Sequence, residues 1–109
     1  MDKKTQKINK KTYWELREYV EEIRDKFAVK EAYLFGSQAK GTSHKYSDYD
    51  LAIITEKAKR NRHRLLVDLL GTIRNVNLLI EPHPMTEEDL KDPNYLLGKE
   101  VKKYGIRIL

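Results

Sequence analysis

The sequence predicts a small α/β (α+β) fold in which helices flank a mixed β-sheet. Two stretches carry apolar residues at the three- and four-residue spacing of amphipathic helices, and an Asp-Pro signal predicts a further helix near the end of the sequence. Between and after them lie short apolar runs that glycine or proline ends, as expected of buried strands. The resulting order of helix, strand, strand, helix, strand, helix is that of helices packed on one sheet. With 109 residues, we expect 1–109 to form a single domain.

The composition narrows the classes of function. Hydrophobic residues make up 39% and charged residues 36% of the chain, which indicates a globular domain. No apolar run approaches the ~20 residues of a membrane span, so we expect no membrane and a cytoplasmic location. The absence of cysteine excludes disulfides and thiolate metal sites. The net charge of +5 suits phosphate-rich ligands, nucleic acid or an acidic protein partner.

The first half of the chain predicts one helix and two strands. The helix has its apolar face at Tyr13, Leu16, Val20, Ile23 and Phe27. Thr12 is its expected N-cap, with Glu15 completing a capping box, and the lysine-rich segment 1–11 is expected to be a frayed terminus. The strands cover 32–35, which Gly36 ends, and 49–55. One helical turn is expected at 37–40.

The second half predicts a helix, a strand and further short elements. The helix carries its apolar stripe at Leu66, Leu69, Leu70 and Ile73 and is weakened by Gly71. The strand covers 76–80 and is stopped by Pro82. A capping signal at 86–89 opens a short helical turn, and Asp92-Pro93 is expected to begin the last helix. That helix ends at Gly105, and 106–109 could add an edge strand.

Asp48 and Asp50 are the first candidate site residues. Alternate strand residues share a face and lie roughly 6.5–7 Å apart, so two carboxylates placed in this way repel each other. A cation would compensate, and a few carboxylate oxygens suit Mg²⁺ or Mn²⁺. The alternative is that both aspartates merely solvate the beginning of a strand.

Gly36-Ser37 shifts the balance toward a site. A glycine after a buried strand, followed by a serine that opens a helical turn, creates a nest of backbone N–H groups suited to phosphates. Together with the hydroxyl of Ser37, this nest would hold the β- and γ-phosphates of a nucleoside triphosphate. Gly41 would let the following loop double back, and Lys40 and Lys45 are candidates to neutralise surplus charge.

The segment from Gly36 to Leu51 resembles a known motif. Gly-Ser, ten residues and Asp-x-Asp are typical of the polymerase-β-like nucleotidyltransferase superfamily. The flanking residues Ala39, Gly41, Ser47 and Leu51 are similar to its minimal nucleotidyltransferase (MNT) branch. The resemblance implies the palm-like fold of that superfamily, dependence on Mg²⁺, and transfer of a nucleoside monophosphate, AMP from ATP, to an acceptor hydroxyl. It also adds Ser47 to the nucleotide-binding residues Gly36, Ser37, Gly41 and Lys45.

The third carboxylate of the family is where the sequence departs from the common pattern. Asn77 stands where an aspartate usually lies on the next strand. Because 77, 79 and 81 share a strand face, Glu81 can point the same way as Asn77. The resemblance then makes Glu81 our preferred third ligand, beside Asp48 and Asp50, in a two-metal mechanism. Some relatives carry a string similar to I-E-P-H-P. The alternative is a solvent-facing Glu81 and an incomplete site. His83 is expected to be a surface turn histidine, although contact with phosphate or with Glu81 remains open.

The short chain restricts the partners. Since 109 residues barely make a catalytic module, we expect a long nucleic acid to need a partner chain, while a homo-oligomer stays open. In the resembling MNT branch, the transferase pairs with an all-helical HEPN protein and acts as an antitoxin that adds AMP to a tyrosine of a HEPN ribonuclease. A HEPN-type partner is therefore our leading interpretation. The alternatives are a non-catalytic nucleotide- or partner-binding module, which Asn77 motivates, and an aminoglycoside-type small-molecule nucleotidyltransferase.

Overall fold

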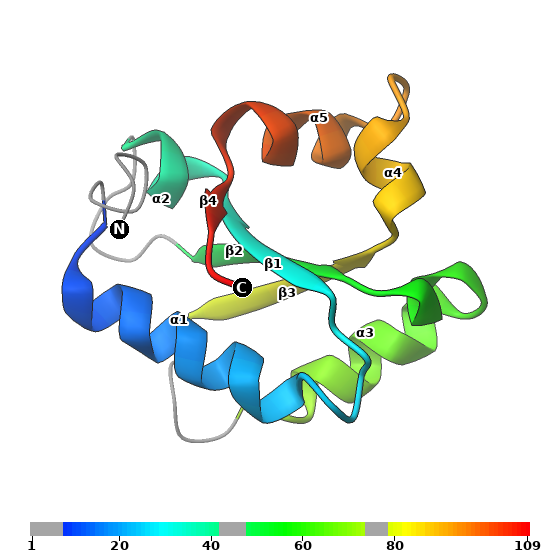
Figure 1. The fold of residues 1–109 in the computed structure, drawn as a ribbon, viewed down its shortest axis with the longest axis horizontal. Helices are drawn as coiled ribbons and strands as arrows, with labels where there is room; N and C mark the ends of the chain where they lie inside the picture. The colour runs from blue at the N-terminus through cyan, green and yellow to red at the C-terminus, as the bar shows by residue number, and fades with distance from the viewer. Residues whose placement is uncertain (1–7, 42–47, 74–78) are drawn as a thin grey trace.

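The computed structural model describes residues 8–41, 48–73 and 79–109 (Figure 1). The elements follow in the order α1 (Lys10–Ile23), β1 (Glu31–Phe35), α2 (Ser37–Lys40), β2 (Tyr49–Ile54), the 3-10 helix η2 (Glu56–Lys59), α3 (Arg62–Leu70), β3 (Ile80–Met85), α4 (Glu87–Lys91), α5 (Leu96–Tyr104) and β4 (Ile106–Arg107). The strands form one sheet in the order β3-β2-β1-β4. β1 is antiparallel to β2 and β4, whereas β2 and β3 are parallel. The mixed sheet flanked by helices confirms the predicted fold class.

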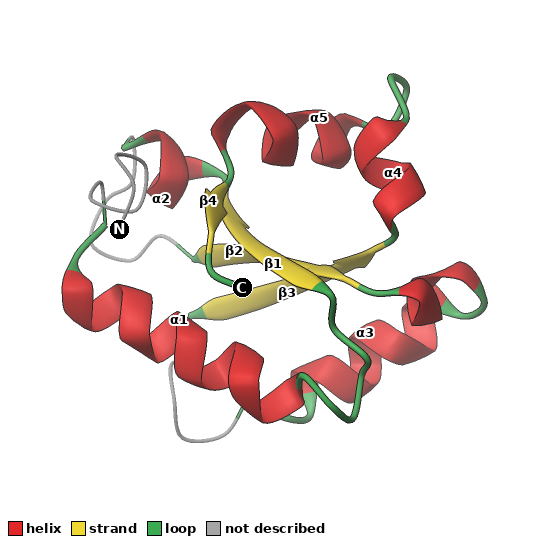
Figure 2. Cartoon of the chain, in the orientation of Figure 1, coloured by secondary structure: helices red, strands yellow, loops and turns green. Residues whose placement is uncertain are grey.

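Helices cover both faces of the sheet, as Figure 2 shows: α1 and α3 lie on one side, and α4 and α5 lie on the other. Strand alternation divides the core in the same way. Leu34 and Leu51 belong to the larger cluster under α1 and α3. Phe35 and Ala52 belong to the smaller cluster, which includes Val101 of α5. Side chains in step with Phe35 and Ala52 therefore point toward α5.

The first helix begins earlier than predicted. Its N-cap is Asn9, whose side-chain oxygen accepts hydrogen bonds from the backbone N–H groups of Lys11 at 2.7 Å and Thr12 at 3.4 Å. Thr12 is therefore inside α1, and the predicted Thr12 cap is wrong. Asparagine is as good a cap as any residue, and its position three residues earlier adds helical hydrogen bonds at this end. The predicted apolar face is otherwise buried at Leu16, Val20 and Ile23.

The third strand was predicted in the wrong place. The predicted segment 76–80 lies outside the described residues except for Leu79, which is in a turn, and Ile80. β3 instead runs through Pro82 and Pro84. β3 lies at the edge of the sheet, and its backbone hydrogen bonds to β2 involve its odd-numbered positions. The carbonyls of Leu79 and Met85 accept hydrogen bonds from the N–H groups of Tyr49 and Thr55, both at 2.9 Å. The missing N–H groups of both prolines therefore fall on the open edge, where proline is tolerated.

α3 buries only part of the predicted stripe. Asn61 caps it by accepting from the N–H of Arg64, and Gly71 ends it. Within these limits, Leu65 and Leu69 are buried, while Leu70 is 48% exposed. Ile73 lies beyond the end of α3 but packs, partly buried, against the same core, so the prediction is wrong at Leu70 and omits Leu65.

The last helix begins after the predicted Asp92-Pro93 signal. The side chain of Asp92 accepts from the N–H of Asn94 at 2.9 Å, so it closes a turn and α5 begins at Leu96. The predicted capping at Thr86 is confirmed, because its hydroxyl and Asp89 form a reciprocal capping box. The predicted end at Gly105 and the edge strand are also confirmed. No helix in the described part of the chain is long and apolar enough to cross a membrane.

Candidate functional site

Three strands bring the candidate residues together at one end of the sheet. Because β1 and β2 are antiparallel, the last residue of β1, Phe35, lies opposite Asp50 near the beginning of β2. Because β2 and β3 are parallel, Asp50 also lies opposite Glu81 near the beginning of β3. Glu81 and His83 are in step on β3, so both share the sheet face of Asp50.

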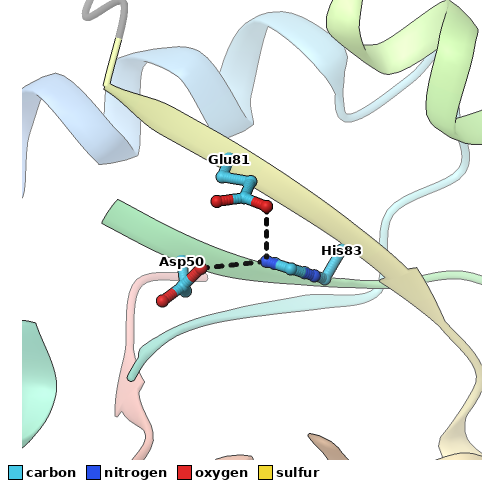
Figure 3. A group of neighbouring side chains, drawn as sticks. All are labelled: Asp50, Glu81 and His83. Carbon is cyan, nitrogen blue, oxygen red and sulfur yellow. Dashed lines mark hydrogen bonds and ion pairs between the residues drawn. The ribbon is translucent and has the colours of Figure 1, made fainter. Parts of the chain in front are cut away.

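Asp50, Glu81 and His83 form a compact cluster of donor atoms (Figure 3). Nε2 of His83 is 3.0 Å from Oδ1 of Asp50 and 3.9 Å from Oε1 of Glu81. One donor atom from each of the three residues lies within 4.8 Å of the others. Asp50 and His83 are half-buried, and Glu81 is exposed. Glu81 and Asp50 therefore face the same side of the sheet, and His83 adds a nitrogen donor.

Gly36 makes the approach of Asp50 to the backbone possible. It follows β1 with φ +75° and ψ −156°, a conformation open almost only to glycine. A Cβ at this position would lie 2.3 Å from Oδ2 of Asp50. Glycine therefore serves two purposes at once: it lets the chain turn from β1 into α2, and it leaves room for the carboxylate.

His83 is the residue that the sequence interpretation undervalued. It lies within β3 and not in a surface turn, so that expectation is wrong. Its ring packs edge-on against Phe35, with ring centroids 5.1 Å apart. The flanking prolines suggested a turn, whereas on an edge strand they are compatible with extended backbone. The two-residue spacing between Glu81 and His83 was the signal that could have placed them together.

A cleft of about 360 Å³ opens on the cluster. Its lining consists of Phe35, Gly36, Lys40, Asp50, His83, Leu96, Leu97 and Glu100. Lys40, predicted as a candidate phosphate contact, places its Nζ 2.9 Å from Oε1 of Glu100 and 4.9 Å from the ring centroid of Tyr104. The ion pair of Lys40 and Glu100 therefore borders the cleft, and Leu96 and Leu97 of α5 also line it.

The other predicted site residues have different positions. Asp48 is exposed directly before β2 and is not part of the three-residue cluster. Ser37 is half-buried at the beginning of α2, as the helical-turn prediction requires. Gly41 ends α2 in the left-handed conformation with φ +77°. Lys45, Ser47 and Asn77 lie outside the described residues.

The donor set fits a divalent cation. Two carboxylates supply the oxygen donors that Mg²⁺ and Mn²⁺ prefer, and they converge from neighbouring strands. Glu81 is exposed and a cleft reaches Asp50 and His83, so there is room for substrate oxygens beside the protein donors. The arrangement can hold a cation against a phosphorylated ligand, with Gly36 at the border.

Comparison with protein families defines the class of this chain. The nucleotidyltransferase domain family matches residues 16–106. This match spans most of the sequence, from α1 to β4, and the chain therefore belongs to the nucleotidyltransferase domain family. No curated protein matches the chain significantly.

Solved structures share the fold at low sequence identity. A candidate nucleotidyltransferase from Sulfolobus solfataricus superposes with a TM-score of 0.62 at 22% identity, covering 87% of this chain and 77% of that protein. A toxin–antitoxin complex with AMP-PNP gives 0.59 at 22% identity, with coverages of 89% and 72%. A mutant of the toxin–antitoxin MntA-HpeT gives 0.54 at 18% identity, with coverages of 94% and 73%.

Proposed function

We propose that this nucleotidyltransferase domain uses a divalent cation to move AMP from ATP to a hydroxyl of a partner protein. The partner we propose is a HEPN-type toxin, with a tyrosine as acceptor, so that the chain acts as an antitoxin. The observation that carries the catalytic part is the convergence of Gly36, Asp50 and Glu81 at one end of the sheet. Family membership supplies the reaction class.

The roles of the residues follow from their chemistry. The backbone after Gly36 and the hydroxyl of Ser37 would hold the β- and γ-phosphates. Asp48, Asp50 and Glu81 would hold the cations, with Lys45 and Ser47 contributing to nucleotide binding and Gly41 to the turn of the loop. Bound Mg²⁺ or Mn²⁺ would neutralise the triphosphate and lower the pKa of the acceptor hydroxyl. The hydroxyl oxygen attacks the α-phosphorus. The bond between the α-phosphorus and the oxygen that bridges it to the β-phosphorus breaks, so that pyrophosphate leaves, and the hydroxyl proton passes to water.

The proposed partner rests on the similar structures and on the surface beside the cleft. Two of the similar structures are described as toxin–antitoxin assemblies, one of them with the ATP analogue AMP-PNP. In this chain, Leu96 of α5 is 74% exposed beside the cleft that reaches Asp50. An apolar side chain at that point suits a protein surface that delivers its acceptor into the cleft.

Label transfer from α-labelled ATP tests the proposal. The chain is incubated with Mg²⁺, the labelled ATP and the product of the neighbouring gene, and the labelled residue is mapped. We expect label on a tyrosine of a helical partner, and loss of transfer in Asp50→Asn. Asp68→Asn is the matched control, because Asp68 is an exposed acid on α3, which covers the opposite face of the sheet from Asp50 (Figure 2). Normal metal-dependent ATP binding without transfer would instead establish a non-catalytic module. Label on an aminoglycoside, supplied in a parallel reaction in place of the gene product, would establish the small-molecule alternative.

The third carboxylate has its own test. Glu81→Ala and Asn77→Ala are compared for transfer rate at saturating Mg²⁺. We expect Glu81→Ala to reduce the rate by at least about tenfold, as loss of a group that holds or orients a metal does. A greater loss from Asn77→Ala would show that the third position belongs to Asn77. If Asp48→Asn and Asp50→Asn both left the affinity for Mg²⁺-ATP unchanged, the whole site assignment would be wrong.

A further inference from the structure

We propose that His83 is a nitrogen ligand of the metal site, together with Asp50 and Glu81. The site would then hold Mn²⁺, or another divalent transition metal, more tightly than Mg²⁺. This inference rests on the proposed function, because it concerns the cation of that same site. It changes the ligand set from carboxylates alone to two carboxylates and one imidazole.

The two separations from Nε2 of His83 are compatible with one shared ion. Ligands about 2.1 Å from an octahedral ion lie about 3.0 Å apart when adjacent and about 4.2 Å apart when opposite. The distance from Nε2 of His83 to Oδ1 of Asp50 is 3.0 Å, which equals the adjacent value. The 3.9 Å to Oε1 of Glu81 falls between the two values. Small side-chain rotations of the exposed Glu81 would complete the geometry.

The surroundings hold the imidazole in this orientation. β3 places Glu81 and His83 on the same face, and the register brings both beside Asp50. The edge of the His83 ring packs against Phe35, and Asp50 is confined by the backbone of Gly36. In Figure 3, Nε2 of His83 points between the two carboxylates, while the other ring nitrogen points away from them. Ligation by Nε2 needs only the neutral tautomer that carries its proton on Nδ1.

The nature of the donors then determines the preference for the metal. Imidazole nitrogen is a good ligand for transition metals, whereas Mg²⁺ strongly prefers oxygen. Exchanging one oxygen donor for nitrogen therefore raises the affinity for Mn²⁺ relative to Mg²⁺. In contrast, a histidine that only donates a hydrogen bond to Asp50 would leave the oxygen-based preference for Mg²⁺ in place. The two roles predict different spectra as well as different affinities.

Pulsed electron paramagnetic resonance of bound Mn²⁺ tests the ligand directly. The full chain is loaded with Mn²⁺ and inorganic tripolyphosphate, so that no nucleobase nitrogen can contribute. We expect a ¹⁴N coupling that is replaced by a ¹⁵N coupling when the protein is grown with ¹⁵N-labelled histidine. This isotope exchange uses the unmutated protein and so does not depend on a variant that folds. The coupling should disappear in His83→Gln and persist in His63→Gln, a matched control on the exposed surface of α3.

Titration of the same samples gives the selectivity. We expect His83→Gln to weaken Mn²⁺ binding about tenfold or more, and Mg²⁺ binding by a smaller factor. One result would overturn this inference and leave the proposed site intact: the unmutated chain binds Mn²⁺ without a histidine nitrogen coupling, and Asp50→Asn abolishes that binding. Wild-type Mn²⁺ affinity in Asp50→Asn, or no Mn²⁺ binding by the unmutated chain, would overturn both.

Discussion

Replacement of Gly36 by alanine should both destabilise the fold and damage the metal site. The backbone at Gly36 has φ +75° and ψ −156°, a region that costs a residue with a Cβ about 1–3 kcal/mol. The new Cβ would also meet Oδ2 of Asp50 at 2.3 Å and force the carboxylate to rotate away from His83. We therefore expect Gly36→Ala to lower the free energy of unfolding by about 2–4 kcal/mol, the sum of the backbone strain and a clash of about 1 kcal/mol.

A double-mutant cycle separates these two costs. In an Asp50→Ala background, the carboxylate atoms that clash with the new Cβ at position 36 are removed. The Cβ at position 50 stays at an ordinary contact distance of 3.4 Å, and the backbone strain at position 36 is unchanged. We expect a coupling free energy of about 1 kcal/mol or more between the two positions in urea unfolding, with unchanged m-values. Gly41→Ala is the control: its φ is +77°, but nothing lies within 4 Å of a Cβ there. It should cost about 1 kcal/mol and retain metal binding. An equal cost of Gly36→Ala in both backgrounds would refute the proposed contact with Asp50.

Three further predictions concern the rest of the fold. Leu69 is fully buried, so Leu69→Ala should lower the free energy of unfolding by about 2–5 kcal/mol. Leu70 is 48% exposed, so Leu70→Ala should change the free energy of unfolding by less than about 0.5 kcal/mol. Equal effects of the two substitutions would contradict the observed buried face of α3. Arg62 pairs with Asp89 at 2.7 Å and ties α3 to α4, so Arg62→Ala should cost about 1 kcal/mol in urea unfolding, while Arg64→Ala, which breaks an exposed pair with Asp68, should have little effect. Burial, followed by the hydrogen bond to Glu31, raises the pKa of the Tyr33 phenol to about 12. Because the folded state retains this proton above the ordinary pKa of about 10, stability should fall between these two pH values, and Tyr33→Phe should flatten that decline in pH-dependent unfolding.

The sequence predicted best what local chemistry determines. The strand before Gly36, the turn at 37–40 and the second strand were predicted correctly, because an apolar run ended by glycine carries its own signal. The capping box at Thr86 is likewise a local pattern of side chain and backbone. These local elements also carry Gly36 and Asp50, so the heart of the candidate site could be inferred without a structure.

The errors at the candidate site occurred where the outcome depends on distant parts of the chain. Pro82 stops a central strand but not an edge strand, and the position of β3 at the edge depends on its pairing with β2. His83 was misjudged for the same reason, because a histidine between prolines becomes a site residue only when that strand lies beside Asp50. Asp48 illustrates the reverse case: alternation places it in step with Asp50, but it precedes the strand and is exposed. Tertiary pairing, which no local pattern encodes, decided all three.

The prolines of β3 have a consequence for how copies of this chain can meet. An open sheet edge normally invites another strand, because its outward N–H and carbonyl groups are free to pair. Pro82 and Pro84 present carbonyl groups at the outward edge but have no N–H groups. The carbonyl groups of an added strand would therefore find no hydrogen-bond donor at these two positions. The opposite edge is β4, which offers only two residues. Both borders of the sheet thus discourage growth by strand addition, which protects the chain against edge-to-edge aggregation and directs any association toward its helical surfaces.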